Sequence, residues 1–350
     1  MEEEKKEIQA KLVENKKEIK KAEITDVLKM ISPGTFLRTA IEGVQKAKTG
    51  GLIVVYNDTV QNIFEGGFKI NARFTPQRII ELGKMDGAII ISKDLKKILY
   101  ANVLLTPDNS IHSNETGTRH KAAERTAKQA GTATICVSQR RDEIALFYGN
   151  TKYIIRDTNE IIRRATSTLQ IIEKHRETFD KNLEDLDREE LKKRPRLIKS
   201  LLFIQRGIII LKVSETLRGY LLELGTEGTI VKARSKELLY KVDKEVDEVI
   251  KDYSRIGSTK SRKILSMLSY DELLEINNIK QCLGVSEDFA LTKGHRQLGK
   301  IGISEEDAGL LIKEFKNLQK IVDLSREDIS KYFSKEKADE IFDKLGHIKE

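Results

Sequence analysis

The pattern of apolar residues changes near Asp157, and this change limits what the chain can fold into. Before it, short runs rich in isoleucine, valine and leucine are separated by polar turns, as in LIVVYN, GFKINARF, GAIIIS and KILYANVLL. These runs have the length and composition of β-strands. After it, apolar residues at 162, 165, 169 and 172 recur at spacings of three and four, which places them on one helix face. The 350 residues are therefore predicted to form several domains, a mixed α/β domain first and helices afterwards.

Capping and turn signals place further elements within residues 25–150. Ser32-Pro33-Gly34 is expected to open a helix that runs through Val44. Thr75-Pro76 is expected to open another, because threonine caps helices and proline suits the first helical position. The runs TATICVSQ and EIALFYG flank the turn Arg140-Arg141-Asp142 and are predicted to form a strand pair.

Charge, cysteine content and the lengths of apolar runs indicate the cellular compartment and the charge of the partners, but they do not indicate the function. The chain has 63 Lys and Arg against 55 Asp and Glu, a net charge of +8 that favours anionic partners. Cys136 and Cys282 have neither disulfide-framework nor zinc-site spacing, so we expect two free thiols in a reducing cytosol. The N-terminus lacks the apolar core of a signal peptide, and the longest apolar run is interrupted by Gln205 and Arg206. These features predict a cytoplasmic protein with no membrane span.

Both ends of the chain are predicted to be helical. Residues 1–24 alternate in charge at helical spacing and are expected to form a charged helical extension. Near the other end, Ser304 and Ser325 each stand three residues before an aspartate, which is a signal for a helix start. The first follows the glycine-containing run LGKIGI, so a helix, a tight turn and a second helix are expected there.

Such a helical hairpin can direct backbone N–H groups at a phosphate, and three basic residues precede it. Lys293, Arg296 and Lys300 stand where a contact to a nucleic-acid backbone would need them. Residues 291–350 nevertheless carry 12 Lys and Arg against 12 Asp and Glu, so a helical protein-interaction domain is an equal interpretation. The run 294–301 has the spacing of a phosphate-binding P-loop, but we reject that reading because Ile301 stands where a hydroxyl should bind the metal.

Two short stretches carry the clearest chemistry. Gly117-Thr118 before a helix can offer unpaired N–H groups and a hydroxyl to a phosphate, while Arg119 and His120 add side-chain donors. Asp86 is followed by Gly87, which lets a ligand come close, and its carboxylate can hold Mg²⁺ or Mn²⁺. Taken singly, each stretch is better explained by ordinary structure, a Thr-capped helix and an Asp-Gly turn, and only the pairing of the two favours a site.

The DGA stretch at 86–88, followed about thirty residues later by GTRH at 117–120, resembles the DNA integrity scanning proteins, a family of diadenylate cyclases. The resemblance covers the chain beyond the N-terminal extension. It implies a mixed α/β cyclase domain at 25–157, an all-α helical spine at 158–289 and a small all-α helix-hairpin-helix domain at 290–350. The family motif usually reads Arg-His-Arg, whereas this chain has Lys121 at the third position, which keeps the charge and loses the guanidinium fork.

The resemblance also implies roles for individual residues. Asp86 would bind the metal, Mg²⁺ or Mn²⁺, and activate a 3′-hydroxyl, with Arg119 and His120 beside it as catalytic residues. The implied ATP-binding residues are Gly87, Leu105 in the adenine pocket, Thr118, Arg119 and His120 at the phosphates, Lys121 and Ala122 in the same loop, and Ser138 near the terminal phosphate. The DNA-binding residues expected in the tail are Lys293, Arg296, Gly299, Lys300 and Gly302.

The implied reaction is the condensation of two ATP into cyclic di-AMP and two pyrophosphates. Because two nucleotides must meet, the resemblance implies facing cyclase domains in a homo-octamer, with branched DNA such as Holliday junctions as a second partner. The second hairpin, ISKYFSKEKADEI, departs from the family because it lacks the usual Gly-x-Gly turn. A DNA-binding scaffold with a regulatory nucleotide pocket is the alternative function.

Overall fold

The computed structural model describes residues 26–349 apart from 193, 194, 288 and 290. The charged extension expected at 1–24 lies outside the described residues. The described chain forms two compact units. The first, here called the sheet unit, contains the residues up to Ala165 together with Gly219–Ile230. The second, the helical unit, contains Thr166–Arg218 and the residues from Val231 onward, so the predicted spine and tail pack together.

The sheet unit is built on a mixed sheet in the order β2-β5-β4-β1-β6-β7-β8, with β3 paired to β5. Strands β1 and β4 are parallel, with Ile53 opposite Ile89, and the other pairs are antiparallel. The strands are β1 Gly51–Val55, β2 Phe64–Glu65, β3 Phe68–Arg73, β4 Ala88–Ile91, β5 Lys97–Leu105, β6 Thr134–Val137, β7 Ile144–Tyr148 and β8 Thr151–Ile155. All predicted strands are confirmed, whereas β2 and β8 were not anticipated.

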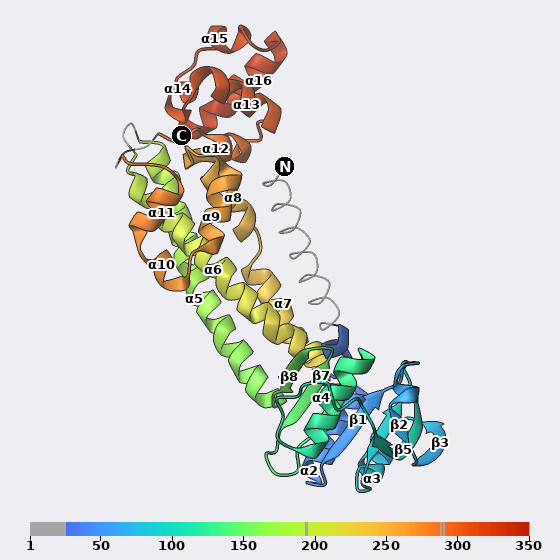
Figure 1. Ribbon diagram of the computed structural model, residues 1–350. Coiled ribbons are helices and arrows are strands. Elements are labelled where there is room, and N and C mark those ends of the chain that lie inside the picture. The colour runs from blue at the N-terminus through green and yellow to red at the C-terminus, as the bar shows by residue number, and fades with distance from the viewer. Residues whose placement is uncertain (1–25, 193–194, 288, 290, 350) are drawn as a thin grey trace, which may run out of the picture. The chain divides into compact units, whose positions relative to one another are not determined.

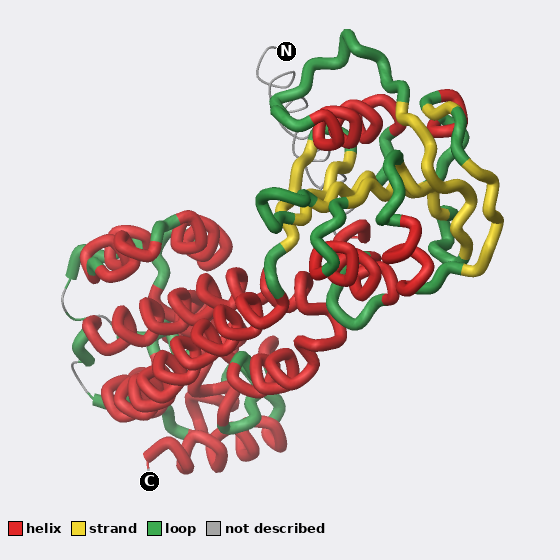
Figure 2. The backbone as a smooth tube through the Cα atoms, turned by 90° about the horizontal axis from the view of Figure 1, so that it is seen from below, coloured by secondary structure: helices red, strands yellow, loops and turns green. Residues whose placement is uncertain are grey.

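Helices cover both faces of this sheet, which explains why β1 and β4 are apolar throughout. Residues of α2 (Phe36–Lys46) and α3 (Pro76–Leu82) pack in the core on one face, and residues of α4 (Thr118–Ala130) pack in the core on the other. Figure 2 shows helices on both sides of the strands. The Thr75-Pro76 helix start is confirmed, since the Thr75 hydroxyl accepts a bond from the Arg78 amide. The start expected at Ser32 is wrong. Thr35 caps α2 instead, because its side chain accepts from the Arg38 amide and Gly34 turns with φ +88°.

Two long helices, α5 and α6, dominate the next part of the chain (Figure 1). They pack through Phe179 and Phe203, whose ring centroids are 4.4 Å apart. The predicted apolar stripe on α5 is confirmed, with Ala165, Leu169 and Ile172 buried. The helices before the tail are α5 Thr158–Glu190, α6 Leu197–Leu224, α7 Thr229–Leu238, α8 Val242–Tyr253, α9 Ser258–Met267, α10 Tyr270–Leu274 and α11 Ile276–Cys282.

The tail consists of α12 His295–Lys300, α13 Glu305–Phe315, α14 Leu318–Val322, α15 Arg326–Ser330 and α16 Lys335–Lys349. Both predicted serine starts are confirmed. Ser304 accepts from the Asp307 amide, and Ser325 forms a reciprocal capping box with Asp328. The tail has an apolar core of its own that includes Leu298, Leu311 and Ile341. The multidomain fold predicted from the sequence, a mixed α/β domain followed by helices, is therefore confirmed. A separate domain at 290–350 stays a prediction.

No helix among the described residues combines the length and apolar character that a membrane span requires. The two cysteines, Cys136 and Cys282, are both free and buried, as expected. Burial raises the pKa of the Cys136 thiol to about 12, so it stays protonated at neutral pH.

Candidate functional site

A polar cleft of about 670 Å³ opens in the sheet unit at the start of α4, and it is called the α4 cleft below. It is lined by Asp86, the residues 115–120 before and at the start of α4, and the residues 137–141 after β6. The cleft therefore brings together the two stretches singled out in the sequence. It also brings in Ser138, a third predicted position.

Helix α4 begins at the cleft without a side-chain cap. Gly117 is the N-cap residue, with φ −85° and ψ 144°, and no side chain bonds to the first turn. The first helical bond runs from the Lys121 amide to the Gly117 carbonyl at 2.9 Å, so the amides of residues 118–120 precede the intrahelical bonding. Thr118 is exposed and is not the cap, which excludes the Thr-capped alternative. With no acidic residue in its first turn, this helix start can attract an anion.

Arg119 reaches across the cleft toward Asp86. Its Nη2 lies 3.6 Å from the Asp86 carboxylate, which is fully exposed, while the arginine side chain is one-third exposed at 33%. Gly50 makes room for this arginine, since a Cβ at Gly50 would come within 2.3 Å of Nη1. Gly50 also has φ +72°, so two independent reasons favour glycine there. The sequence analysis missed Gly50, although the Gly50-Gly51 pair before β1 was a signal for close backbone approach.

Gly87 is required by the sheet itself. It has φ +88°, and a Cβ there would lie 2.8 Å from the Val103 carbonyl oxygen on β5. The glycine thus lets the segment between α3 and β4 pack directly against β5. This packing fixes the backbone position of Asp86. Its expected contact with a nucleotide stays a prediction.

His120 lies half-buried at the base of the cleft. Burial lowers its pKa, and the neighbouring Glu115 carboxylate offsets part of that decrease. The imidazole is therefore neutral at pH 7. It can donate one hydrogen bond to a ligand, but it carries no positive charge. Glu115 in turn forms an ion pair with Lys152 at 2.7 Å. Glu115 was not selected from the sequence, and its signal, an acidic residue two positions before Gly117, is a weak one.

Hydrogen bonds join the segment before α4, residues 111–114, to side chains of α4. Glu124 accepts from the Ser113 hydroxyl and the Asn114 amide, and Lys128 donates to the His112 carbonyl at 2.8 Å. Arg125 donates to the Ile111 carbonyl at 2.9 Å. These bonds hold the approach to Gly117 in one conformation, so the amides of the helix start point into the cleft before any ligand arrives.

The turn after β6 adds positive charge. Ser138 stands at its start, and its hydroxyl accepts from the Arg141 amide at 3.1 Å. Arg140 and Arg141 line the cleft and are exposed. The turn was predicted, but its place in the same cleft as Arg119 was not, because that depends on the packing of α4 against β6.

Four of the predicted ATP-binding residues lie outside the lining of the α4 cleft, namely Gly87, Leu105, Lys121 and Ala122. Leu105 is only 9% exposed and packs in the core cluster beneath α4, with Ala122 against the same cluster. Lys121 is exposed one turn along the helix. The structure thus does not bring these residues to the polar cleft, and their contacts with a nucleotide stay predictions.

The described residues contain no cluster of three or more His, Cys, Asp or Glu side chains that could hold a metal ion. Asp86 is a single exposed carboxylate at the cleft. This arrangement fits Mg²⁺ or Mn²⁺ bound through one carboxylate, with phosphates and water as the other ligands.

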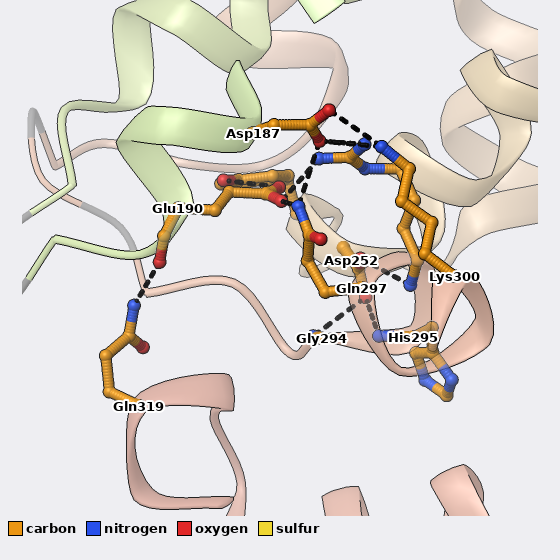
Figure 3. A network of polar contacts seen from close by, with 10 residues as sticks. Asp187, Glu190, Asp252, Gly294, His295, Gln297, Lys300 and Gln319 are labelled. Carbon is orange, nitrogen blue, oxygen red and sulfur yellow. Dashed lines mark hydrogen bonds and ion pairs between the residues drawn. The ribbon is translucent and has the colours of Figure 1, made fainter. Parts of the chain in front are cut away.

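In the tail, the expected DNA contacts are placed differently from the prediction. The Arg296 side chain is completely buried between two carboxylates, so the predicted phosphate contact by Arg296 is wrong. Lys300 forms an ion pair with Asp187 at 2.7 Å (Figure 3). Lys293 donates to the carbonyls of Lys251 on α8 and of Ser254, the residue that ends α8. Gly299, near the end of α12, and Gly302, in the turn between α12 and α13, are exposed, and the Gly302 carbonyl accepts from Lys344 at 2.8 Å. The rejected P-loop run forms the short helix α12, which follows no strand.

Comparison with known proteins identifies the domain in which the α4 cleft lies. Residues 38–152 match the nucleotide-binding region of the DisA bacterial checkpoint controller, and residues 155–291 match its linker region. The DNA integrity scanning protein DisA of Acetivibrio thermocellus is 41% identical over 318 residues, which cover 88% of either chain. The chain belongs to the DisA family of DNA integrity scanning proteins.

Other members of the family are similar over nearly the whole chain. The DisA protein of Clostridium botulinum strain Eklund 17B is 37% identical over 338 residues, 93% of this chain and 96% of the relative. That of Clostridioides difficile is 39% identical over 317 residues, 86% of this chain and 88% of the relative. The matched regions place the α4 cleft in the family's nucleotide-binding domain.

Proposed function

We propose that the chain is a diadenylate cyclase that condenses two ATP into cyclic di-AMP and releases two pyrophosphates. The observation that carries this proposal is the α4 cleft, where Asp86 faces Arg119 at 3.6 Å beside an uncapped helix start. The family's nucleotide-binding domain supports ATP as the ligand. The expected roles of Asp86, Thr118, Arg119 and His120 belong to the same proposal.

The reaction needs positioning and charge stabilisation more than a protein nucleophile. In each of two steps, the 3′-oxygen of one ATP attacks the α-phosphorus of the other, the bond from that phosphorus to the bridging oxygen of pyrophosphate breaks, and the hydroxyl proton leaves. The amides at the start of α4 and the Arg119 guanidinium would hold the triphosphate, and His120 would donate one hydrogen bond. Asp86, with no side chain covering it, would bind the metal and assist removal of the hydroxyl proton. Mg²⁺ or Mn²⁺, when bound, would neutralise phosphate charge.

One α4 cleft has the polar residues for one triphosphate, so a two-nucleotide ring needs two clefts that face each other. We propose that two copies of the chain supply them, within the homo-octamer that the family resemblance implies. In a mixture of Asp86→Asn and Arg119→Ala chains, every facing pair would contain two altered clefts, so the mixture should make no more cyclic di-AMP than the two variants make separately.

We further propose that branched DNA such as a Holliday junction binds the tail and slows the synthesis of cyclic di-AMP. The exposed turn at Gly299 and Gly302 is the proposed contact. The helix that follows it starts with Glu305, Glu306 and Asp307, which disfavour a phosphate at that helix start. We therefore expect weak, sequence-independent binding that decreases steeply with salt.

The direct test is to incubate the full chain with ATP and either Mg²⁺ or Mn²⁺, with and without junction DNA, and to measure cyclic di-AMP by mass spectrometry. We expect product with either metal and less product when the junction is present. ATP binding without product would favour the alternative, a DNA-binding scaffold whose nucleotide pocket is regulatory.

A further inference from the structure

A buried polar cluster, here called the joint, fixes α12 to the long helix α5. Its centre is Arg296, whose side chain has no exposed surface and lies 2.5 Å from both Asp187 and Glu190. Gln297 donates to the same two carboxylates, at 2.9 Å and 2.8 Å, and Lys300 adds a second cation at Asp187 (Figure 3). Three side chains of α12, those of Arg296, Gln297 and Lys300, are thus bonded to the last turn of α5.

A second helix of the spine, α8, binds the start of α12. Asp252 on α8 accepts hydrogen bonds from the amides of Gly294, His295 and Arg296 at 3.1, 2.8 and 3.1 Å. Its carboxylate therefore caps α12 from a distant part of the chain, as Figure 3 shows. Lys293 reinforces this end by donating to the carbonyls of Lys251 and Ser254.

The two carboxylates of the joint, Asp187 and Glu190, depend on the positive charge of Arg296. The charge of Arg296 holds the pKa of Asp187 below its usual range, although burial alone would raise it. Glu190 is fully buried and also accepts from the Tyr253 hydroxyl at 3.1 Å. Without Arg296, Glu190 would be a buried carboxylate with no cation beside it, which is an unfavourable state.

Helix α12 leads directly into the exposed turn that we propose as the DNA contact. The Gly302 amide bonds to the Gly299 carbonyl at 3.1 Å, and the Ile303 amide bonds to the Leu298 carbonyl at 3.1 Å. Because these bonds tie the turn to α12, the direction of the turn follows the direction of α12.

We infer that Arg296 is a positioning residue that fixes the DNA-contacting turn to α5, so that DNA on the tail acts on the spine through the joint. This inference rests on the proposed coupling of the tail to cyclic di-AMP synthesis. It assigns to Arg296 a role in transmission, in place of the phosphate contact predicted from the sequence. Without the joint, the tail would bind DNA as an independent module.

The test compares full-length Arg296→Gln with the unmodified chain and with Arg326→Gln as a matched control. Arg326 also contacts two carboxylates, Asp339 and Asp343, but both lie within the tail. Hydrogen exchange by mass spectrometry follows the amides of 294–296, and junction affinity and cyclic di-AMP synthesis are measured in parallel. For Arg296→Gln we expect at least tenfold faster exchange, junction affinity within threefold, unchanged synthesis without DNA, and loss of more than half of the inhibition by junction DNA. Arg326→Gln should behave as the unmodified chain does.

A neutral triple variant, Arg296→Met with Asp187→Asn and Glu190→Gln, covers the case in which the single variant misfolds. It neutralises Asp187 and Glu190 together with Arg296, so neither of these carboxylates is left charged without its guanidinium, and it should fold and still lose the inhibition. Full inhibition in either folded variant would overturn the inference, as would unchanged exchange in Arg296→Gln. If the unmodified chain makes cyclic di-AMP but ignores junction DNA, the proposed DNA coupling fails, and transmission through the joint fails with it. Faster exchange in Arg296→Gln would then support only the fixing of α12.

Discussion

Two helices of this protein start in nearly the same way in sequence and serve opposite purposes in the structure. Gly117 precedes Thr118-Arg119-His120 at the start of α4, and Gly294 precedes His295-Arg296-Gln297 at the start of α12. The amides of the first start face a polar cleft, whereas those of the second bond to Asp252. Arg119 is one-third exposed, and the Arg296 side chain is buried between carboxylates. A glycine followed by basic residues therefore predicts a helix start, but not whether that start is available to an anion.

The largest difference between the two helix starts is expected if the open start of α4 belongs to a catalytic cleft. We expect Asp86→Asn to lower cyclic di-AMP synthesis by about 100-fold or more, because it removes the charge that would hold the metal and assist the hydroxyl. The fold should be retained, since the Asp86 side chain is fully exposed. Circular dichroism and product formation by mass spectrometry measure the two effects.

Asp58→Asn is the matched control, because Asp58 is an exposed carboxylate of the same unit that does not line the cleft. It should leave synthesis unchanged. Near-normal product from folded Asp86→Asn protein would contradict the role of Asp86.

The capped helix start should matter for stability, and the open one should not. Asp252→Ala leaves three buried amides without their acceptor, so we expect the free energy of unfolding to fall by about 2–3 kcal/mol. Thr118→Ala removes no cap, so its effect should stay within about 0.5 kcal/mol. Urea unfolding followed by circular dichroism compares the two variants, and equal effects would remove the distinction drawn above.

The open helix start should matter for ligand binding. Arg119→Ala deletes a charge-assisted contact to phosphate, and we expect ATP affinity to fall roughly 10-fold to 100-fold. Calorimetry with a non-reacting ATP analogue measures the change. Arg78→Ala, on the exposed face of α3, should leave affinity as it is, and the same result for Arg119→Ala would exclude a phosphate contact.

The smallest expected effect concerns protonation within the cleft. Because burial lowers the pKa of His120, the imidazole is neutral at pH 7 and gains its charge only at more acidic pH. His120→Gln keeps a neutral donor, so ATP affinity at pH 7 to 8 should change less than about threefold. As the pH falls through the lowered pKa, the unmodified chain should gain affinity relative to the variant, since only its side chain becomes cationic.

ATP also changes its protonation over this pH range, but this change is the same for both proteins. It cancels in the ratio of the ATP affinity of the unmodified chain to that of His120→Gln. A ratio that is already large at pH 8 would show that His120 contributes more than one neutral hydrogen bond.

Local sequence signals determined much of this protein. Thr75-Pro76, Ser304 and Ser325 were recognised as helix starts because each cap is made by atoms within three residues. The buried strands were recognised because burial on both faces requires continuous apolar runs. The residues Asp86 and Gly117–His120 were found for the same reason, since each stretch carries its chemistry within a few positions.

Tertiary structure decided which of these positions are available. Arg296 and Glu190 are 106 residues apart in sequence, and Asp252 is 42 residues from the first amide that it caps, so neither contact could be found in a local pattern. The packing of α4 against β6 likewise brought Arg140 and Arg141 to the cleft that Arg119 lines. A charged group binds whichever opposite charge is nearest in space, and in the tail that partner was a carboxylate of the spine rather than a phosphate.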